Sequence, residues 1–211
     1  MNTKYALITG ASSGIGKACA MILAKNGYGL ILSGRREERL EQVKSEIESK
    51  YQVPCKVAVF DVRIRNEVEA FVNSLESPWN QISVLINNAG FGDYGMFVET
   101  DWNKELQMIN LNITTLTHFT KLYLKDMIKR RSGKIMNIAS TAAFQPGPMM
   151  AVYFATKAYV LSFTEAISNE VIDKGITITA LCPGATETGF QAAGGLEDSK
   201  LFKEKFDAHW S

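Results

Sequence analysis

The stretch 5-YALITGASSGIGKA-18 decides the fold of this 211-residue chain. Its first five residues form a short apolar run, which is typical of a strand buried on both faces of a sheet. Glycines follow at positions 10, 14 and 16, and the residues after Gly14 have the pattern of a helix that ends near Gly27. A strand, a glycine-rich turn and a helix in this order predict the first βα unit of an α/β fold.

The same alternation continues along the chain. Further strands are predicted at 29–34, 55–62, 82–90, 133–140 and 176–182, with helical segments between them, the longest over 101–130 and 151–174. The strands are nearly continuous runs of Val, Ile and Leu, as in a parallel sheet covered on both faces. The sequence therefore predicts an α/β, doubly wound Rossmann fold with a parallel sheet of six strands.

The composition is that of an ordinary soluble globular protein. The net charge is +1 and 46% of the residues are apolar, so nucleic acid and anionic membranes are not expected as partners. The start of the chain lacks a basic and apolar leader, and no apolar run approaches the roughly 20 residues of a membrane span. Cys19, Cys55 and Cys182 are far apart, and His118 and His209 are too few for a zinc site. We expect a cytoplasmic protein without a metal.

The glycine-rich turn has three possible interpretations. Bare glycines at a helix N-terminus let backbone N–H groups approach a phosphate, which after a first strand indicates dinucleotide binding. A P-loop does not fit, because Ala11 takes the place of its first glycine and Ala18 that of its hydroxyl residue. The segment 10-GASSG-14 also matches the nucleophile elbow of serine hydrolases, although His209 would be the only late base.

Four motifs in register resemble the short-chain dehydrogenase/reductase family over about residues 3–190. They are TGxxxGxG in the turn, 87-NNAG-90, a serine 13 residues before YxxxK (Ser140, Tyr153, Lys157), and Pro183-Gly184 after the sixth strand. The resemblance implies an oxidoreductase that transfers hydride between a nicotinamide cofactor and a carbonyl or secondary alcohol.

The resemblance also assigns the catalytic residues. It makes Tyr153 the general acid/base, lets Ser140 hold the substrate oxygen, and gives Lys157 to the nicotinamide ribose and to the support of Tyr153. Asn110 in 108-MINLN-112 matches an asparagine that supports a proton relay. Physical chemistry agrees, because a free tyrosine has a pKa of roughly 10 and a nearby ammonium group lowers it.

The end of the second strand points to NADP(H) rather than NAD(H). Gly34 stands where an NAD site has an acidic residue, and Arg35 and Arg36 follow it. Arginine suits a phosphate, and Ser33 supplies another donor. The alternative to phosphate binding is that these arginines belong to the charged face of the next helix. This alternative suits Arg36 better than Arg35.

Further contacts follow from the resemblance and from apolar loops after the later strands. The expected cofactor residues are Gly10, Ser12, Ser13, Gly14, Ile15, Gly16, Asp61, Val62, Asn88, Ala89, Gly90, Tyr153, Lys157, Pro183, Gly184 and Thr188. The expected substrate residues are Phe91, Tyr94, Phe144, Met149, Met150 and Phe190, which favour an apolar ketone or aldehyde unless they are ordinary core residues.

We expect the chain to divide into a dinucleotide-binding domain over 1–190, which carries the catalytic residues, and a tail or substrate flap over 191–211. Members of the family commonly continue to a seventh strand, so by resemblance we expect this to be either a short member or a truncated chain. A homodimer through the helices at 101–130 and 151–174, or a homotetramer, is expected by resemblance. The leading hypothesis is an NADPH-dependent carbonyl reductase; a dinucleotide sensor without activity and a serine hydrolase are the alternatives.

Overall fold

The computed structural model describes residues 3–184 of the chain. Six strands form one sheet: β1 (Tyr5–Thr9), β2 (Gly29–Gly34), β3 (Cys55–Val59), β4 (Ile82–Asn87), β5 (Gly133–Ile138) and β6 (Ile176–Leu181). They are all parallel and lie in the order β3-β2-β1-β4-β5-β6. This confirms the predicted doubly wound fold, whose strand order reverses between β1 and β4.

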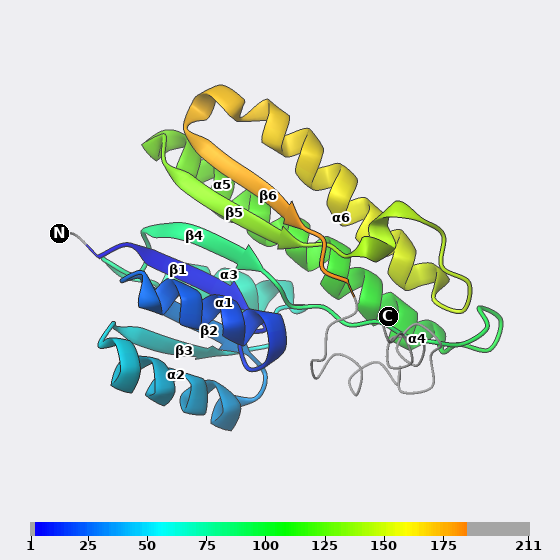
Figure 1. Cartoon of the computed structure of the whole chain (residues 1–211), viewed down its shortest axis with the longest axis horizontal. Coiled ribbons are helices and arrows are strands. Elements are labelled where there is room, and N and C mark those ends of the chain that lie inside the picture. The colour runs from blue at the N-terminus through cyan, green and yellow to red at the C-terminus, as the bar shows by residue number, and fades with distance from the viewer. Residues whose placement is uncertain (1–2, 185–211) are drawn as a thin grey trace, which may run out of the picture.

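Helices cover both faces of the sheet. They are α1 (Gly14–Lys25), α2 (Glu37–Tyr51), α3 (Arg65–Ser74), α4 (Trp102–Ile109), α5 (Leu116–Arg130) and α6 (Ala151–Glu170). The helices α1 and α2 pack on one face through small and branched side chains, while α3, α5 and α6 pack on the other. In Figure 1 the arrows of β1, β4, β5 and β6 point toward the end of the sheet where α4 lies. No helix within residues 3–184 is long and apolar enough to cross a membrane.

The apolar runs become strands because both of their faces are buried. Leu7 and Ile8 are adjacent in β1 and face opposite sides of the sheet, yet neither is exposed. Leu7 packs in the apolar cluster with α3 and α5, and Ile8 packs in the cluster with α1 and α2. Continuous apolar sequence is therefore what these strands require.

Four strands end earlier than their apolar sequence suggests. Predictions of 55–62, 82–90, 133–140 and 176–182 correspond to strands that end at residues 59, 87, 138 and 181. The residues just beyond these ends leave the sheet and line a cavity. The long region predicted as a helix over 101–130 is also interrupted, by a π-helical turn, η1 (Asn110–Thr115), between α4 and α5.

A chain of buried polar side chains joins β4 to β5 beside this end of the sheet. Asn87 and Asn137 are register partners, and the Asn87 amide donates to Asn137 Oδ1 (2.9 Å) and to Thr120 Oγ1 (3.0 Å). The Asn137 amide donates in turn to Thr164 Oγ1 on α6 (3.0 Å). Since buried amides cost free energy unless they are bonded, this chain fixes the lateral positions of β4, β5 and α6.

Candidate active site

The glycine-rich turn has the shape that its residues require. Gly10 and Gly14 have φ of +66° and +54°, in the left-handed region that favours glycine. A Cβ on Gly16 would lie 2.4 Å from the carbonyl oxygen of Gly10. Gly16 therefore lets α1 pack tightly against the turn, but it does not itself line the cavity, contrary to its predicted role as a cofactor contact.

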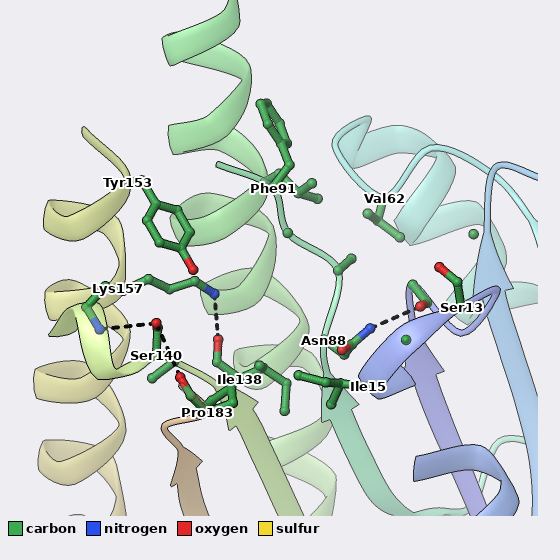
Figure 2. A pocket seen from close by; sticks show the side chains of 18 of the residues that line it. Ser13, Ile15, Val62, Asn88, Phe91, Ile138, Ser140, Tyr153, Lys157 and Pro183 are labelled. Atoms are coloured by element: carbon green, nitrogen blue, oxygen red, sulfur yellow. Dashed lines mark hydrogen bonds between the residues drawn. The ribbon is translucent and has the colours of Figure 1, made fainter. Parts of the chain in front are cut away.

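A cavity of about 610 Å³ opens at the carboxyl ends of the strands, at the reversal of strand order. It is lined by most of the residues predicted from the sequence: Gly10, Ser12, Ser13, Gly14, Ile15, Arg35, Arg36, Asp61, Val62, Asn88, Ala89, Gly90, Phe91, Ser140, Met150, Tyr153, Lys157, Pro183 and Gly184. Figure 2 shows Ser13 and Asn88 toward one end and Tyr153, Lys157 and Ser140 toward the other. The volume lies within the usual range of small-molecule sites.

Ser140, Tyr153 and Lys157 meet at one end of this cavity. Tyr153 and Lys157 are one turn apart on α6, and both are buried. The Lys157 ammonium group lies 5.8 Å from the centre of the Tyr153 ring and donates to the carbonyl of Ile138 at 2.7 Å. Ser140 follows β5 and its hydroxyl accepts from the backbone N–H of Ala142 (3.1 Å). The helical spacing thus places the phenol and the cation together, and the chain that follows β5 brings the Ser140 hydroxyl to them.

The environment shifts the pKa of both α6 residues. Burial raises the pKa of Tyr153, and the hydrogen bond with Ser140 offsets this rise only in part. Burial also lowers the pKa of Lys157 from 10.5 to about 8. The expectation that Lys157 lowers the pKa of Tyr153 is thus not met, because desolvation of the phenol is the largest effect. At neutral pH the phenol keeps its proton.

Asn112 stands beside this group where the sequence pointed to Asn110. The Asn112 amide donates to the carbonyl of Phe91 (2.9 Å) and to Thr156 Oγ1 (3.0 Å), and its carbonyl accepts from the N–H of Phe91 (3.2 Å). Within the described residues, Asn110 has no side-chain hydrogen bond and does not line the cavity. Asn112 does not line the cavity either, but its hydrogen bonds connect it to the cavity-lining residue Phe91 and to Thr156 of α6.

The other end of the cavity carries positive charge. Arg36 Nη2 donates to Ser12 Oγ (2.8 Å) and to Ser13 Oγ (3.1 Å), and thereby bridges the end of β2 and the glycine-rich turn. Arg35 lines the same end. Ser33 does not, because it is fully buried in β2 and its hydroxyl has no partner among the described residues. The predicted phosphate contact of Ser33 is therefore wrong, and Arg36 is the arginine fixed in place.

Only part of the predicted substrate wall lines the cavity. Phe91 and Met150 do, whereas Tyr94 packs in the core beside them. Phe144 is 67% exposed and Met149 lies outside the lining, so the structure brings neither to this site. Thr188, Phe190 and the tail at 191–211 lie outside the described residues.

Several lining residues were missed by the sequence interpretation. They are Phe60, Arg63, Lys104, Gln107, Leu111, Ala142, Gln145 and Phe154, among others. Phe154 could have been predicted from the sequence, because it follows Met150 by one helical turn at the start of α6. One side of α4 and of the following turn η1 carries Lys104, Gln107 and Leu111. Their spacing in the sequence predicts that they lie on the same side of a helix, but it does not predict which part of the protein that side contacts.

Comparison with known proteins identifies the family. A family model described as short chain dehydrogenase matches residues 4–197. The chain belongs to the short-chain dehydrogenase family. It is therefore an oxidoreductase that acts on CH–OH and C=O groups with a nicotinamide cofactor.

Individual members of the short-chain dehydrogenase family agree with this assignment. An uncharacterized oxidoreductase of Staphylococcus epidermidis is 33% identical over 187 residues, which cover 88% of this chain and 79% of that protein. The very-long-chain 3-oxoacyl-CoA reductase-B of Danio rerio is 36% identical over 187 residues, or 85% of this chain and 58% of that protein. Actinorhodin polyketide ketoreductase, solved with NADPH, superposes with a TM-score of 0.88 at 35% identity and covers 97% of this chain and 80% of its own.

The contacts of Ser12 and of the histidines do not support the serine hydrolase alternative. Ser12, its required nucleophile, is bonded to Arg36 rather than to a histidine base. His118 lies 3.8 Å from Glu69 and does not line the cavity, and His209 is outside the described residues.

Proposed function

We propose that this enzyme transfers hydride between NADP(H) and an apolar ketone, aldehyde or the corresponding alcohol. One observation carries the proposal: a single cavity joins the Arg36–Ser12–Ser13 cluster to the Ser140–Tyr153–Lys157 group. A cation at one end suits a phosphate of a dinucleotide, and a proton donor at the other end suits the substrate beside its nicotinamide. The dinucleotide would lie across the strand ends.

The residues present fit such a cofactor. The turn at Gly10 and Gly14 leaves backbone N–H groups open at the N-terminus of α1, where a diphosphate is stabilised. Arg36 and Arg35 would hold the 2′-phosphate of NADP(H), and Gly34 offers no carboxylate to repel it. Lys157 would hold the nicotinamide ribose. When bound, the nicotinamide supplies or accepts the hydride.

The side chains at the other end would manage the proton. Tyr153 Oη, kept protonated by burial, donates to the carbonyl oxygen as it gains negative charge. Ser140 Oγ donates a second hydrogen bond to the same oxygen and stabilises that charge. Asn112 takes the place proposed for Asn110: by tying Phe91 to Thr156, it holds the loop and the turn of α6 that carry the site.

The cavity around Tyr153 has several apolar lining residues, beside the polar Thr141 and Gln145. Phe91, Ala142, Met150 and Phe154 line it around Tyr153. This wall favours a substrate with an apolar group beside its carbonyl, which the very-long-chain acyl group in the name of one relative would supply. A homodimer through the helical regions at 101–130 and 151–174 or a homotetramer, and a cytoplasmic location, stay predictions from the sequence.

Loss of NADPH absorbance with a panel of carbonyl compounds tests the proposal. We expect turnover of apolar ketones, no turnover by Tyr153→Phe, and unchanged NADPH binding by that variant. Preference for small charged ketones would overturn the substrate assignment. Binding of NADPH without turnover of any carbonyl would instead favour the sensor.

A further inference from the structure

The turn after β5 directs its polar side chains, and not its aromatic one, toward the cavity. Thr141 and Gln145 line the cavity, whereas Phe144 is 67% exposed and does not line it. Burial of a phenylalanine side chain stabilises a fold, so the hydrophobic effect would favour the opposite orientation. A polar side chain gains nothing from apolar neighbours unless it is hydrogen-bonded. The orientation of this turn therefore points to a polar partner for Thr141 and Gln145.

The backbone of this turn is fixed beside the catalytic residues. The Thr141 N–H donates to the carbonyl of Pro183 (3.0 Å), and the Ala142 N–H donates to the Ser140 hydroxyl (3.1 Å). Ala142 is buried in the same apolar cluster as Tyr153. The two polar side chains are thus carried by a fixed turn that begins next to Ser140, the proposed contact of the reacting carbonyl oxygen.

The polar groups of this turn are not engaged by the described part of the chain. Among residues 3–184, neither the Gln145 amide nor the Thr141 hydroxyl makes a side-chain hydrogen bond. Both side chains are exposed, so water bonds to them in the free enzyme. A substrate that displaces this water without offering a partner leaves the Gln145 amide unsatisfied, which weakens binding. A substrate with an oxygen at this position replaces the water and keeps the hydrogen bond.

The chemistry of the turn selects the kind of oxygen. An amide N–H and a hydroxyl both donate, and a carbonyl oxygen accepts with two lone pairs. The segment 140–150 contains no charged side chain, so it offers no cation to a carboxylate. A neutral carbonyl is therefore the group that suits this turn.

We propose that the substrate carries a second carbonyl close to the reacting one, as in a 3-oxo ester or thioester, and that Gln145 selects it. The Gln145 side chain donates through Nε2 to this second oxygen, and the Thr141 hydroxyl is a further donor on the same turn. The apolar part of the substrate packs against Met150 and Phe154, which line the cavity at the start of α6. Gln145 is thus a specificity-determining residue outside the group that moves the proton. This inference rests on the proposed hydride transfer and narrows its substrate class.

Initial rates with NADPH and either ethyl 3-oxohexanoate or nonan-4-one test the proposal. The two ketones have chains of equal length, and only the first contains an ester group. Because that group also activates the neighbouring ketone, the ratio of the two kcat/KM values, ester over plain ketone, is compared between wild type and variant. We expect Gln145→Met, which keeps the length of the side chain and removes its hydrogen-bonding groups, to lower this ratio about 5- to 30-fold.

The control is Gln81→Met, because Gln81 is exposed and does not line the cavity. Its ratio should stay within about twofold of wild type. Fluorescence titration with NADPH shows that each variant is folded.

An unchanged ratio in Gln145→Met would overturn the inference while the proposed function stands, whether both rates fall together or neither falls. A preference of the wild-type enzyme for nonan-4-one would also overturn it, and this comparison needs no variant to fold. Failure of the wild-type enzyme to reduce any carbonyl compound with NADPH would overturn the proposed function as well.

Discussion

Replacing Lys157 by methionine should change how the stability of the enzyme depends on pH. The pKa of Lys157 falls from 10.5 to about 8 because the ammonium group is buried. A tenfold change in a proton-binding constant corresponds to about 1.4 kcal/mol, so keeping this group charged in the fold costs about 3 kcal/mol. The bond to the Ile138 carbonyl returns only a part of that cost.

The cost is present in full below about pH 8, where Lys157 is protonated in both the folded and the unfolded chain. Between about pH 8 and 10.5 the folded chain has lost the proton while the unfolded chain still binds it. Stability therefore rises with pH through this window. From about pH 7 to about pH 9.5, the wild-type enzyme should gain about 2 kcal/mol relative to Lys157→Met.

Urea unfolding followed by circular dichroism at the two pH values measures this difference. Comparison with the variant cancels the titration of the other groups, and Lys125→Met, which removes an exposed lysine of α5, is the control. A free-energy difference between wild type and Lys157→Met that is equal at both pH values would contradict the lowered pKa of Lys157. Lys157 would then have an ordinary pKa, and its burial would carry no cost.

Three further changes test other parts of the account. Arg36→Leu should raise the Kd for NADPH about 10- to 100-fold and that for NADH less than about twofold in a fluorescence titration, since only NADPH has the phosphate; equal rises would contradict the assignment. Asn137→Leu should lower the free energy of unfolding in urea by about 2 kcal/mol, because one Asn87 N–H loses its buried acceptor and Thr164 loses a donor; a neutral result would contradict this. Gly16→Ala should weaken both stability and NADPH binding, because its Cβ would lie 2.4 Å from a carbonyl of the turn; a normal melting temperature would show that the turn yields.

The sequence was sufficient for the features that depend on local pattern. Continuous apolar runs identified all six strands, because a parallel sheet buried on both faces tolerates little else. The glycines at 10 and 14 predicted the turn between β1 and α1, where both residues have left-handed backbone angles. The YxxxK spacing brought Tyr153 and Lys157 together because four residues make one helical turn.

Features that depend on neighbouring elements were not predictable in this way. Asn110 and Asn112 are equivalent by composition, and only the packing of η1 against Phe91 selects Asn112. The choice between Arg35 and Arg36 depends on which side chain reaches the glycine-rich turn. Arg63 lies next to the expected cofactor contact Val62, but its bonds to Asp61 and Gln107 exist only in the folded chain.

Hydride transfer from labelled cofactor is the most direct test of the proposed reaction. The enzyme is incubated with an apolar ketone and NADPH that carries two deuterium atoms at C4 of the nicotinamide, and the alcohol is analysed by mass spectrometry. We expect one deuterium on the carbinol carbon with the wild-type enzyme and with Tyr159→Phe, a conservative change at a partly exposed tyrosine of the same helix. With Tyr153→Phe we expect almost no alcohol. Unlabelled alcohol, or labelled alcohol formed by Tyr153→Phe at the wild-type rate, would contradict the proposed reaction.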